Sequence, residues 1–226
     1  MDQVVVKPKI GAVLFDCDGV LVDTENLGNA VLVKLLNEYG CPVTEDMTHR
    51  LFVGGTLSMI GPKMTEMYGV TLPDNWTDEC YARTFEALRN DMEPFDYVDD
   101  ILDLLDGANI PFAIGSNGPH DKMDISLGKV NILNRFTGRI CSARDVPHAK
   151  PAPDVYHLAA SRVEVDIHDC IVIDDSVSGV RAGVASGATT IGLVGATPGN
   201  LLLENGAHYL ANDHRELYEM LKGWLS

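Results

Sequence analysis

The chain has 226 residues, of which 46% are apolar and 22% are charged, and its formal net charge is −16. This composition excludes a disordered chain, and the length suits one large domain or a core domain that carries a smaller one. The negative charge repels nucleic-acid backbones and anionic lipids, so we expect neither a nucleic-acid partner nor a membrane partner.

Cysteine usage and the first residues favour a cytoplasmic protein. The five cysteines form no C-x-x-C pair, so we interpret them as reduced thiols without a zinc site. The amino-terminal sequence MDQVVVKPKIGAVLF contains an apolar run too short to span a bilayer and lacks the flanks of a secretory signal. We expect a monomer or a small homo-oligomer.

The first predicted element is a buried strand over residues 10–15, an apolar run in which Gly11 is the only small interruption. Such a short, unbroken run is typical of a strand that helices cover on both faces. Asp16 and Asp18 follow the run, with Cys17 between them. Because ligands gather beyond the carboxyl ends of parallel strands, this acidic pair is a candidate site for a hard cation. One acid could attack a phosphorus atom while the other transfers a proton.

A helical insert is predicted next, over residues 24–92. Its first helix, over residues 24–39, has apolar residues at helical spacing and ends at Gly40. Beyond it, glycine and proline residues divide the segment into pieces of helical length without a convincing strand. We therefore predict a smaller helical domain over residues 24–92 and a core domain formed by residues 1–23 and 93–226.

Strands and helices alternate in the rest of the chain. The predicted helices and strands, in chain order, are 95–106, 111–115, 120–130, 139–142, 170–173, 176–186, 189–193 and 213–221, of which 111–115, 139–142, 170–173 and 189–193 are strands. This alternation predicts an α/β fold with a doubly wound parallel sheet.

Further polar residues stand beside these predicted elements. Ser116 and Asn117 follow a strand, and a hydroxyl group with the backbone amides after it can hold a phosphate oxygen. Asp174 and Asp175 follow another strand and form a second acidic pair. Lys150 lies in HAKPAPDVY, where the prolines predict an extended lead-in to a helix. Each of these residues alone also has an ordinary structural explanation, as a helix cap or a solvated loop charge.

Together these motifs, beginning with FDCDGVLVDTE, resemble in their order the signatures of the haloacid dehalogenase superfamily, in its magnesium-dependent phosphohydrolase branch. The resemblance implies a Rossmann-like core with a helical cap, and a phosphatase that acts on a small phosphorylated metabolite through an aspartyl phosphate. Mg²⁺ is the implied cofactor.

The same resemblance implies a role for each motif residue. Asp16 is the nucleophile, Asp18 the general acid and base, and Lys150 the cation that neutralises the nucleophile and the phosphoryl group. The implied substrate-binding residues are Ser116, Asn117 and Lys150. The implied metal ligands are Asp16, Asp18, Asp174 and Asp175.

Within this branch the sequence is similar to the β-phosphoglucomutase and phosphoglycolate phosphatase group, and SNGPHDKM resembles bacterial 6-phosphogluconate phosphatase-like hydrolases. The mutases typically carry a histidine in the first cap helix, where this chain has Gly28, and an arginine in the cap loop, where it has Leu57. These differences favour simple phosphate release from a sugar phosphate or a phospho-sugar acid. A β-phosphoglucomutase-like phosphomutase stays an alternative. In the cap loop, Gly54 and Thr56 are candidate substrate contacts.

Two other classes of protein share parts of this pattern. Phospho-acceptor regulatory domains also place carboxylates, a hydroxyl residue, a lysine and Mg²⁺ on a doubly wound sheet. They are much shorter, and their acidic pair follows the first strand, whereas here the pair Asp174 and Asp175 comes late. Dehalogenases need neither a second acid nor a metal, so Asp18 and the late acidic pair count against that activity.

Overall fold

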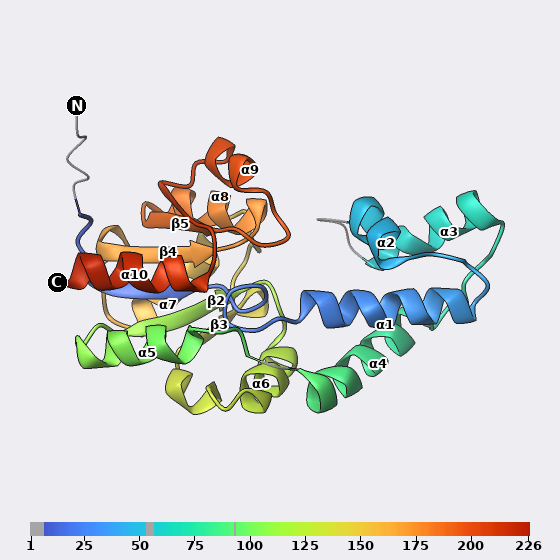
Figure 1. Cartoon of the computed structure of the whole chain (residues 1–226), viewed down its shortest axis with the longest axis horizontal. Coiled ribbons are helices and arrows are strands. Elements are labelled where there is room, and N and C mark those ends of the chain that lie inside the picture. Colours follow the sequence, from blue (N-terminus) through green and yellow to red (C-terminus); the bar gives the residue numbers. More distant parts are fainter. Residues whose placement is uncertain (1–6, 53–56, 93) are drawn as a thin grey trace. The chain divides into compact units, whose positions relative to one another are not determined.

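The computed structural model describes residues 7–52, 57–92 and 94–226. The chain forms two compact units, an α/β unit with the bounds Met1–Asp23 and Glu93–Ser226 and a helical unit, Thr24–Met92. Their elements are labelled in Figure 1. That the helical unit serves as a cap stays a prediction.

In the described part of the α/β unit, six parallel strands form one sheet with the order β3-β2-β1-β4-β5-β6. The strands are β1 (Ala12–Phe15), β2 (Phe112–Ser116), β3 (Ile140–Ser142), β4 (Cys170–Asp174), β5 (Thr189–Leu193) and β6 (Tyr209–Ala211). The predicted doubly wound parallel sheet is confirmed. The sequence interpretation missed β6, because three residues are too short a run to show a strand pattern.

The register of the central strands brings their carboxyl ends to one level. Phe15 of β1 pairs with Ile114 of β2 on one side and with Ile173 of β4 on the other. From β1 the sheet grows in both directions, and such a reversal of strand order is where open α/β sheets bind their ligands. The residues that follow β1, β2 and β4 therefore meet at one edge.

Helices connect the strands and cover both faces of the sheet. They are α5 (Val98–Gly107), α6 (His120–Lys129), α7 (Asp154–Arg162), α8 (Val177–Ser186), α9 (Gly199–Glu204) and α10 (His214–Leu225). Helices α7 and α8 contact each other and the strands, and α5 and α10 contact each other. In Figure 1, α5 and α10 lie in front of the sheet and α7 lies behind it. The sequence interpretation did not include α9.

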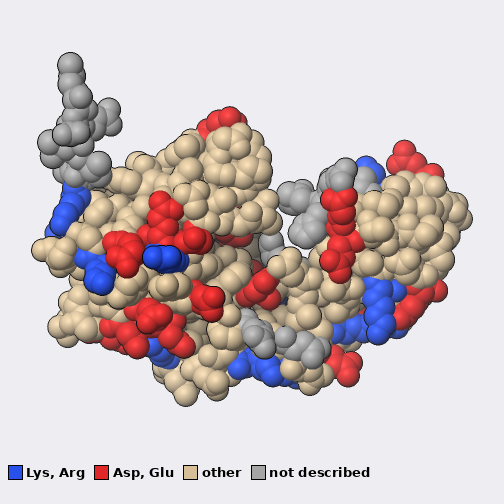
Figure 2. Space-filling view, viewed as in Figure 1, with Lys and Arg blue, Asp and Glu red and all other residues tan. Residues whose placement is uncertain are grey.

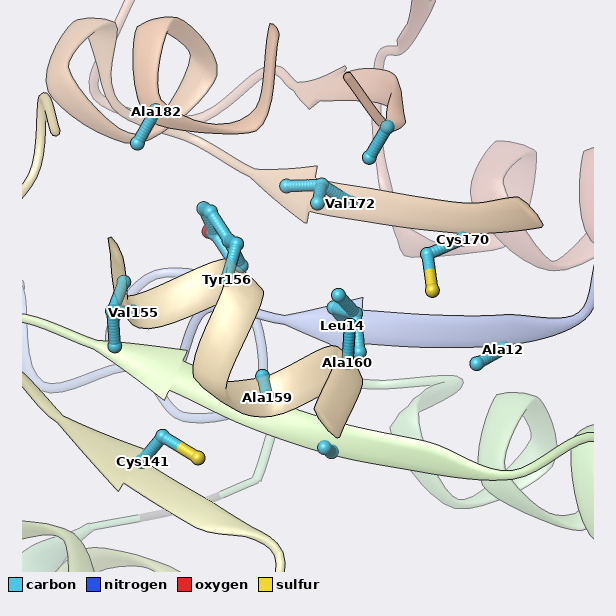
Figure 3. Packing of buried hydrophobic residues seen from close by; sticks show 12 residues of the cluster. Ala12, Leu14, Cys141, Val155, Tyr156, Ala159, Ala160, Cys170, Val172 and Ala182 are labelled. Atoms are coloured by element: carbon cyan, nitrogen blue, oxygen red, sulfur yellow. The ribbon is translucent and has the colours of Figure 1, made fainter. Parts of the chain in front are cut away.

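The strands are buried on both faces, as their continuous apolar runs predict. Leu14 and Val172 point toward α7 and pack with Tyr156 in the cluster of Figure 3. Phe15 is the next residue in β1 and therefore faces the opposite side of the sheet. Its ring meets that of Phe112 edge to face, with 6.4 Å between the ring centroids. Such pairs contribute about 0.5–1.5 kcal/mol beyond the area that they bury.

The helical unit has a hydrophobic core of its own. Its elements are α1 (Glu25–Glu38), α2 (Glu45–Phe52), the 3₁₀ turn η1 (Leu57–Met59), α3 (Ile60–Tyr68) and α4 (Trp76–Asp91). Leu35, Leu36 and Met64 are fully buried in this core, and Trp76 packs with them. Across the described ranges of the whole chain, every helix is too short or too polar to cross a bilayer.

Candidate active site

A buried lysine joins two aspartates at the carboxyl edge of the sheet. Asp16 directly follows β1 and Asp174 ends β4. The Lys150 Nζ atom donates hydrogen bonds to Asp16 Oδ1 at 2.7 Å and to Asp174 Oδ2 at 2.8 Å. Only 3% of the Lys150 side chain is exposed, and the Asp174 side chain is fully buried. Three residues far apart in the sequence thus form one buried ionic cluster.

Burial and charge act in opposite directions on these groups. Burial raises the pKa of Asp16 to about 6, although Lys150 lowers it in part. Burial would lower the pKa of Lys150, but the carboxylates of Asp16 and Asp174 outweigh this effect and raise it. The lysine therefore stays charged near neutral pH, and Asp16 is largely ionised there.

Three carboxylates at this edge form a donor set that fits a divalent cation. Oxygen atoms of Asp16, Asp174 and Asp175 lie within 4.8 Å of one another, and all three residues are buried. Carboxylate oxygens are the hard donors that Mg²⁺ prefers, and three buried negative charges need compensation beyond one lysine.

Several hydrogen bonds hold the carboxylate of Asp174 in place. Its Oδ2 atom accepts from Lys150 Nζ and from the Tyr156 hydroxyl, at 2.8 and 2.6 Å. Its Oδ1 atom accepts from the Ser176 amide and hydroxyl, at 2.9 and 2.8 Å. A carboxylate has about four lone-pair sites, so these donors occupy them. Direct metal contact by Asp174 would therefore require the loss of one of these hydrogen bonds.

Two glycines allow the backbone to approach these carboxylates closely. Gly19 has a φ of 78°, and a Cβ atom at this position would overlap the Asp175 carboxylate. A Cβ atom at Gly179, in the first turn of α8, would overlap the Asp174 carboxylate. Only glycine fits at both places without a shift of the acidic side chain. The glycine of the D-x-D-G motif is thus part of what positions the late acidic pair.

Ser116 and Asn117 lie beside Lys150. Ser116 ends β2, is 1% exposed, and accepts a hydrogen bond from the Gly118 amide at 3.1 Å. The Asn117 side chain accepts from the Lys150 amide at 2.9 Å and donates to the Lys150 carbonyl oxygen at 3.4 Å. Asn117 therefore holds the main chain of Lys150, a function that the sequence did not reveal. The cap-loop candidates Gly54 and Thr56 lie outside the described residues.

Asp18 has a partner that the sequence interpretation missed. The Lys122 Nζ atom lies 2.8 Å from Asp18 Oδ2, and the two side chains are 24% and 21% exposed. Burial would lower the pKa of Lys122, but Asp18 outweighs this effect and raises it. Lys122 is in the first turn of α6, where the helix dipole disfavours a cation. A lysine at this unfavourable position of the helix is the feature of the sequence that could have indicated a specific role for Lys122.

Outside this edge the surface is strongly acidic. Figure 2 shows acidic side chains gathered over α5, whose exposed residues include Asp99, Asp100, Asp103 and Asp106. Such a surface does not attract an anion. An anionic ligand would therefore need local positive groups, and Lys150 and Lys122 are two such groups among the described residues of this edge.

A family model confirms the resemblance seen in the sequence. The model of the haloacid dehalogenase-like hydrolases matches residues 13–193, which include every motif described above. The chain belongs to the haloacid dehalogenase-like hydrolases. In this hydrolase, the matched segment runs from β1 to the end of β5 and contains the whole acidic edge.

Individual proteins resemble this haloacid dehalogenase-like hydrolase over most of their length. It is 32% identical to 6-phosphogluconate phosphatase of Escherichia coli, over 79% of this chain and 80% of that protein. It is 28% identical to a phosphorylated carbohydrates phosphatase of Thermotoga maritima, over 93% and 98% of the two chains. A HAD family hydrolase from Deinococcus radiodurans, solved with bound phosphate and sodium, superposes with a TM-score of 0.86 at 28% identity, covering 97% of each chain.

Proposed function

We propose that this hydrolase is a magnesium-dependent phosphatase that hydrolyses a small phosphorylated metabolite, a sugar phosphate or a phospho-sugar acid. The observation that carries the proposal is the buried contact of Lys150 with Asp16 beside Asp174 and Asp175. This contact supports the proposal because it would give the reaction a nucleophile, a fixed cation and oxygen donors for Mg²⁺ at one edge. The names of the similar proteins, 6-phosphogluconate phosphatase and phosphorylated carbohydrates phosphatase, support this substrate class.

The first half of the proposed reaction transfers the phosphoryl group to the enzyme. A carboxylate oxygen of Asp16 attacks phosphorus in line with the leaving oxygen, so an Asp16–phosphorus bond forms as the ester bond breaks. Asp18 gives its proton to the leaving alkoxide. Lys150 donates hydrogen bonds to Asp16 and Asp174, and an ammonium has three N–H groups, so one is left for a phosphoryl oxygen.

The second half releases phosphate. Asp18, now ionised, takes a proton from a water molecule, and the water oxygen attacks phosphorus. The bond between phosphorus and Asp16 breaks, and the Asp16 carboxylate is restored. Whenever Asp18 is ionised, its carboxylate pairs with Lys122, whose ammonium group lies 2.8 Å from Oδ2.

Mg²⁺ fits the carboxylates of Asp16 and Asp175, and the Asp18 carbonyl oxygen is a further proposed ligand. When bound, the cation supplies compensation for the negative charge of the phosphoryl oxygens. Ser116 and Asn117 complete the proposed phosphate site, Ser116 through its hydroxyl group. Substrate contacts from Gly54 and Thr56 remain proposals.

Two positions in the helical unit weigh against a phosphomutase. Gly28 has no side chain that could move a proton or contact a second phosphate. Leu57 is half-buried and packs against the hydrophobic core of the helical unit, a contact that favours an apolar side chain at this position. Simple hydrolysis therefore has the better support. The match to a hydrolase family model counts against the alternative that this chain is a phospho-acceptor regulatory domain.

Phosphate release is expected to depend on Mg²⁺ by at least about 100-fold, because the carboxylates of the site repel a phosphate dianion without the cation. The measurement is phosphate release from sugar phosphates, 6-phosphogluconate, phosphoglycolate and nucleotides, with Mg²⁺ or with a chelator. Sugar phosphates or 6-phosphogluconate should give the highest kcat/KM. Equal rates in both metal conditions would contradict the proposed site, and nucleotides as the best substrates would contradict the proposed class.

Replacing Lys122 with methionine is expected to lower kcat by about 10-fold, because the Asp18 carboxylate loses the partner that positions it. The KM value should change less, because Lys150 still holds the phosphoryl group. The matched control is Lys129→Met, which removes an exposed lysine from the last turn of the same helix. Equal kcat values for the two variants would show that Lys122 has no part in catalysis.

A further inference from the structure

Tyr156 is a buried polar side chain in contact with the site. It lies in the first turn of α7, is fully buried, and is among the largest buried side chains of the described core. Its hydroxyl group donates to Asp174 Oδ2 at 2.6 Å. The Lys150 Nζ atom lies over its ring, 4.7 Å from the ring centroid. Tyr156 thus touches both partners of the Lys150–Asp174 ion pair.

The ring has little room to move. In Figure 3, Tyr156 points from α7 into the layer between the helix and the strands. A Cβ atom added at Gly115, in β2, would lie 3.0 Å from Tyr156 Cδ1, so the ring edge packs directly on the strand backbone. The next residue of this strand is Ser116. Close packing of this kind restricts the movement of the ring and of its hydroxyl group.

The hydroxyl group and the lysine share one acceptor. Tyr156 and Lys150 both donate to Asp174 Oδ2, while Ser176 occupies Oδ1. A carboxylate held by donors at both oxygens cannot rotate, so the position of Oδ2 is set from two sides. The ammonium group of Lys150 is then fixed by Asp174 on one side and Asp16 on the other.

We propose that Tyr156 is a positioning residue for the phosphoryl-transfer step. It acts through Asp174, by holding the acceptor that aims the remaining N–H group of Lys150 at the transferring phosphoryl oxygen. The proposal rests on the proposed phosphatase function. The role of Tyr156 should affect kcat, because Lys150 stabilises negative charge that develops on the phosphoryl group only during the transfer.

The test is Tyr156→Phe, which keeps the ring, its packing and its contact with the lysine but removes the hydroxyl group. We expect kcat for p-nitrophenyl phosphate with Mg²⁺ to fall about 10-fold and KM to stay within about twofold. The matched control is Tyr39→Phe, which removes a tyrosine–carboxylate hydrogen bond of 2.5 Å to Glu79 in the helical unit. This control should leave kcat unchanged.

A double-mutant cycle separates positioning from general packing. In an Asp174→Asn background the charged acceptor is gone, so Tyr156→Phe should lower kcat less than about twofold further. Calorimetric titration with Mg²⁺ alone should give the same affinity for Tyr156→Phe and the wild type within about threefold, because Asp16 and Asp175 are unchanged. Urea unfolding shows whether each variant is folded.

Three outcomes would overturn the proposal. A folded Tyr156→Phe protein with wild-type kcat would show that the hydroxyl group only satisfies packing. Independent, multiplying effects of Tyr156→Phe and Asp174→Asn would show that Tyr156 does not act through Asp174. A loss of Mg²⁺ affinity in Tyr156→Phe would show that the tyrosine acts on the metal ligands instead. If the wild type released no phosphate from any substrate, the proposed function itself would fail, which is a different result.

Discussion

Replacing Asp16 with asparagine is expected to lower kcat for phosphate release by at least about 10³-fold and, in a chelator, to make the folded protein more stable. The activity is lost because an amide cannot form the phosphorylated intermediate, and removal of a nucleophile has effects of this size or larger. An Asp16→Asn protein that released phosphate at the wild-type rate would refute Asp16 as the nucleophile.

The gain in stability follows from the raised pKa of Asp16, which burial moves to about 6. A carboxyl group with a folded-state pKa above its unfolded value contributes most stability when protonated, below about pH 4, and this contribution is lost as the pH rises through 6. At pH 7.5 the wild type is therefore penalised for a buried charge. Asparagine removes that penalty, which is about 3 kcal/mol.

Urea unfolding of both proteins from pH 4 to pH 8, with a chelator present, measures this effect. The difference in unfolding free energy should be small at pH 4 and should grow through pH 6. Asp103→Asn is the control, because this exposed aspartate pairs with Arg135 at the surface. The substitution should change the unfolding free energy by less than about 0.5 kcal/mol. Added Mg²⁺ should stabilise the wild type more than Asp16→Asn. A variant less stable than the wild type at pH 7.5 would contradict the prediction.

Replacing Lys150 with methionine is expected to reduce both stability and activity. Methionine fills a similar volume but leaves Asp16 and Asp174 without the ammonium group between them. Removal of one partner from a buried ion pair costs about 3–5 kcal/mol, and loss of one fixed charge-stabilising donor costs about 10²–10³ in kcat. In urea with a chelator, the unfolding free energy should fall by about 3 kcal/mol.

The matched control for this lysine is Lys9→Met. Lys9 also pairs with an aspartate, Asp169, at 2.6 Å, but its side chain is 74% exposed. An exposed pair contributes about 0–1 kcal/mol, so this variant should keep its stability and its full kcat. If Lys150→Met and Lys9→Met had the same unfolding free energy, the buried cluster would not stabilise the fold as the geometry indicates.

The parts of the site that directly follow strands could be predicted from the sequence. Asp16, Ser116 and Asp174 each stand at the end of a short apolar run, and parallel strands with aligned ends bring such residues together. The local pattern of apolar runs therefore predicts both the sheet and the positions of these polar residues at its edge. The same pattern gave no sign of β6 or α9, because short elements contain too few residues to show a period.

The contacts that orient the site could not be predicted from local periodicity, because they join distant segments of the chain. Lys150 and Asp16 are 134 positions apart, and no periodicity in either segment encodes their hydrogen bond. Tyr156 stands in HAKPAPDVY and Lys122 in SNGPHDKM, and neither motif indicates a partner for its side chain. Their partners, Asp174 and Asp18, become apparent only once α6 and α7 are packed on the sheet.

The balance of charge at the acidic edge has a consequence for how ligands enter it. Three buried carboxylates, Asp16, Asp174 and Asp175, gather there beside the ammonium group of Lys150. A divalent cation bound beside these carboxylates would lower the negative charge that a phosphate dianion meets. By thermodynamic linkage each ligand must strengthen the binding of the other by the same factor. Occupancy by metabolite and by metal should therefore rise and fall together.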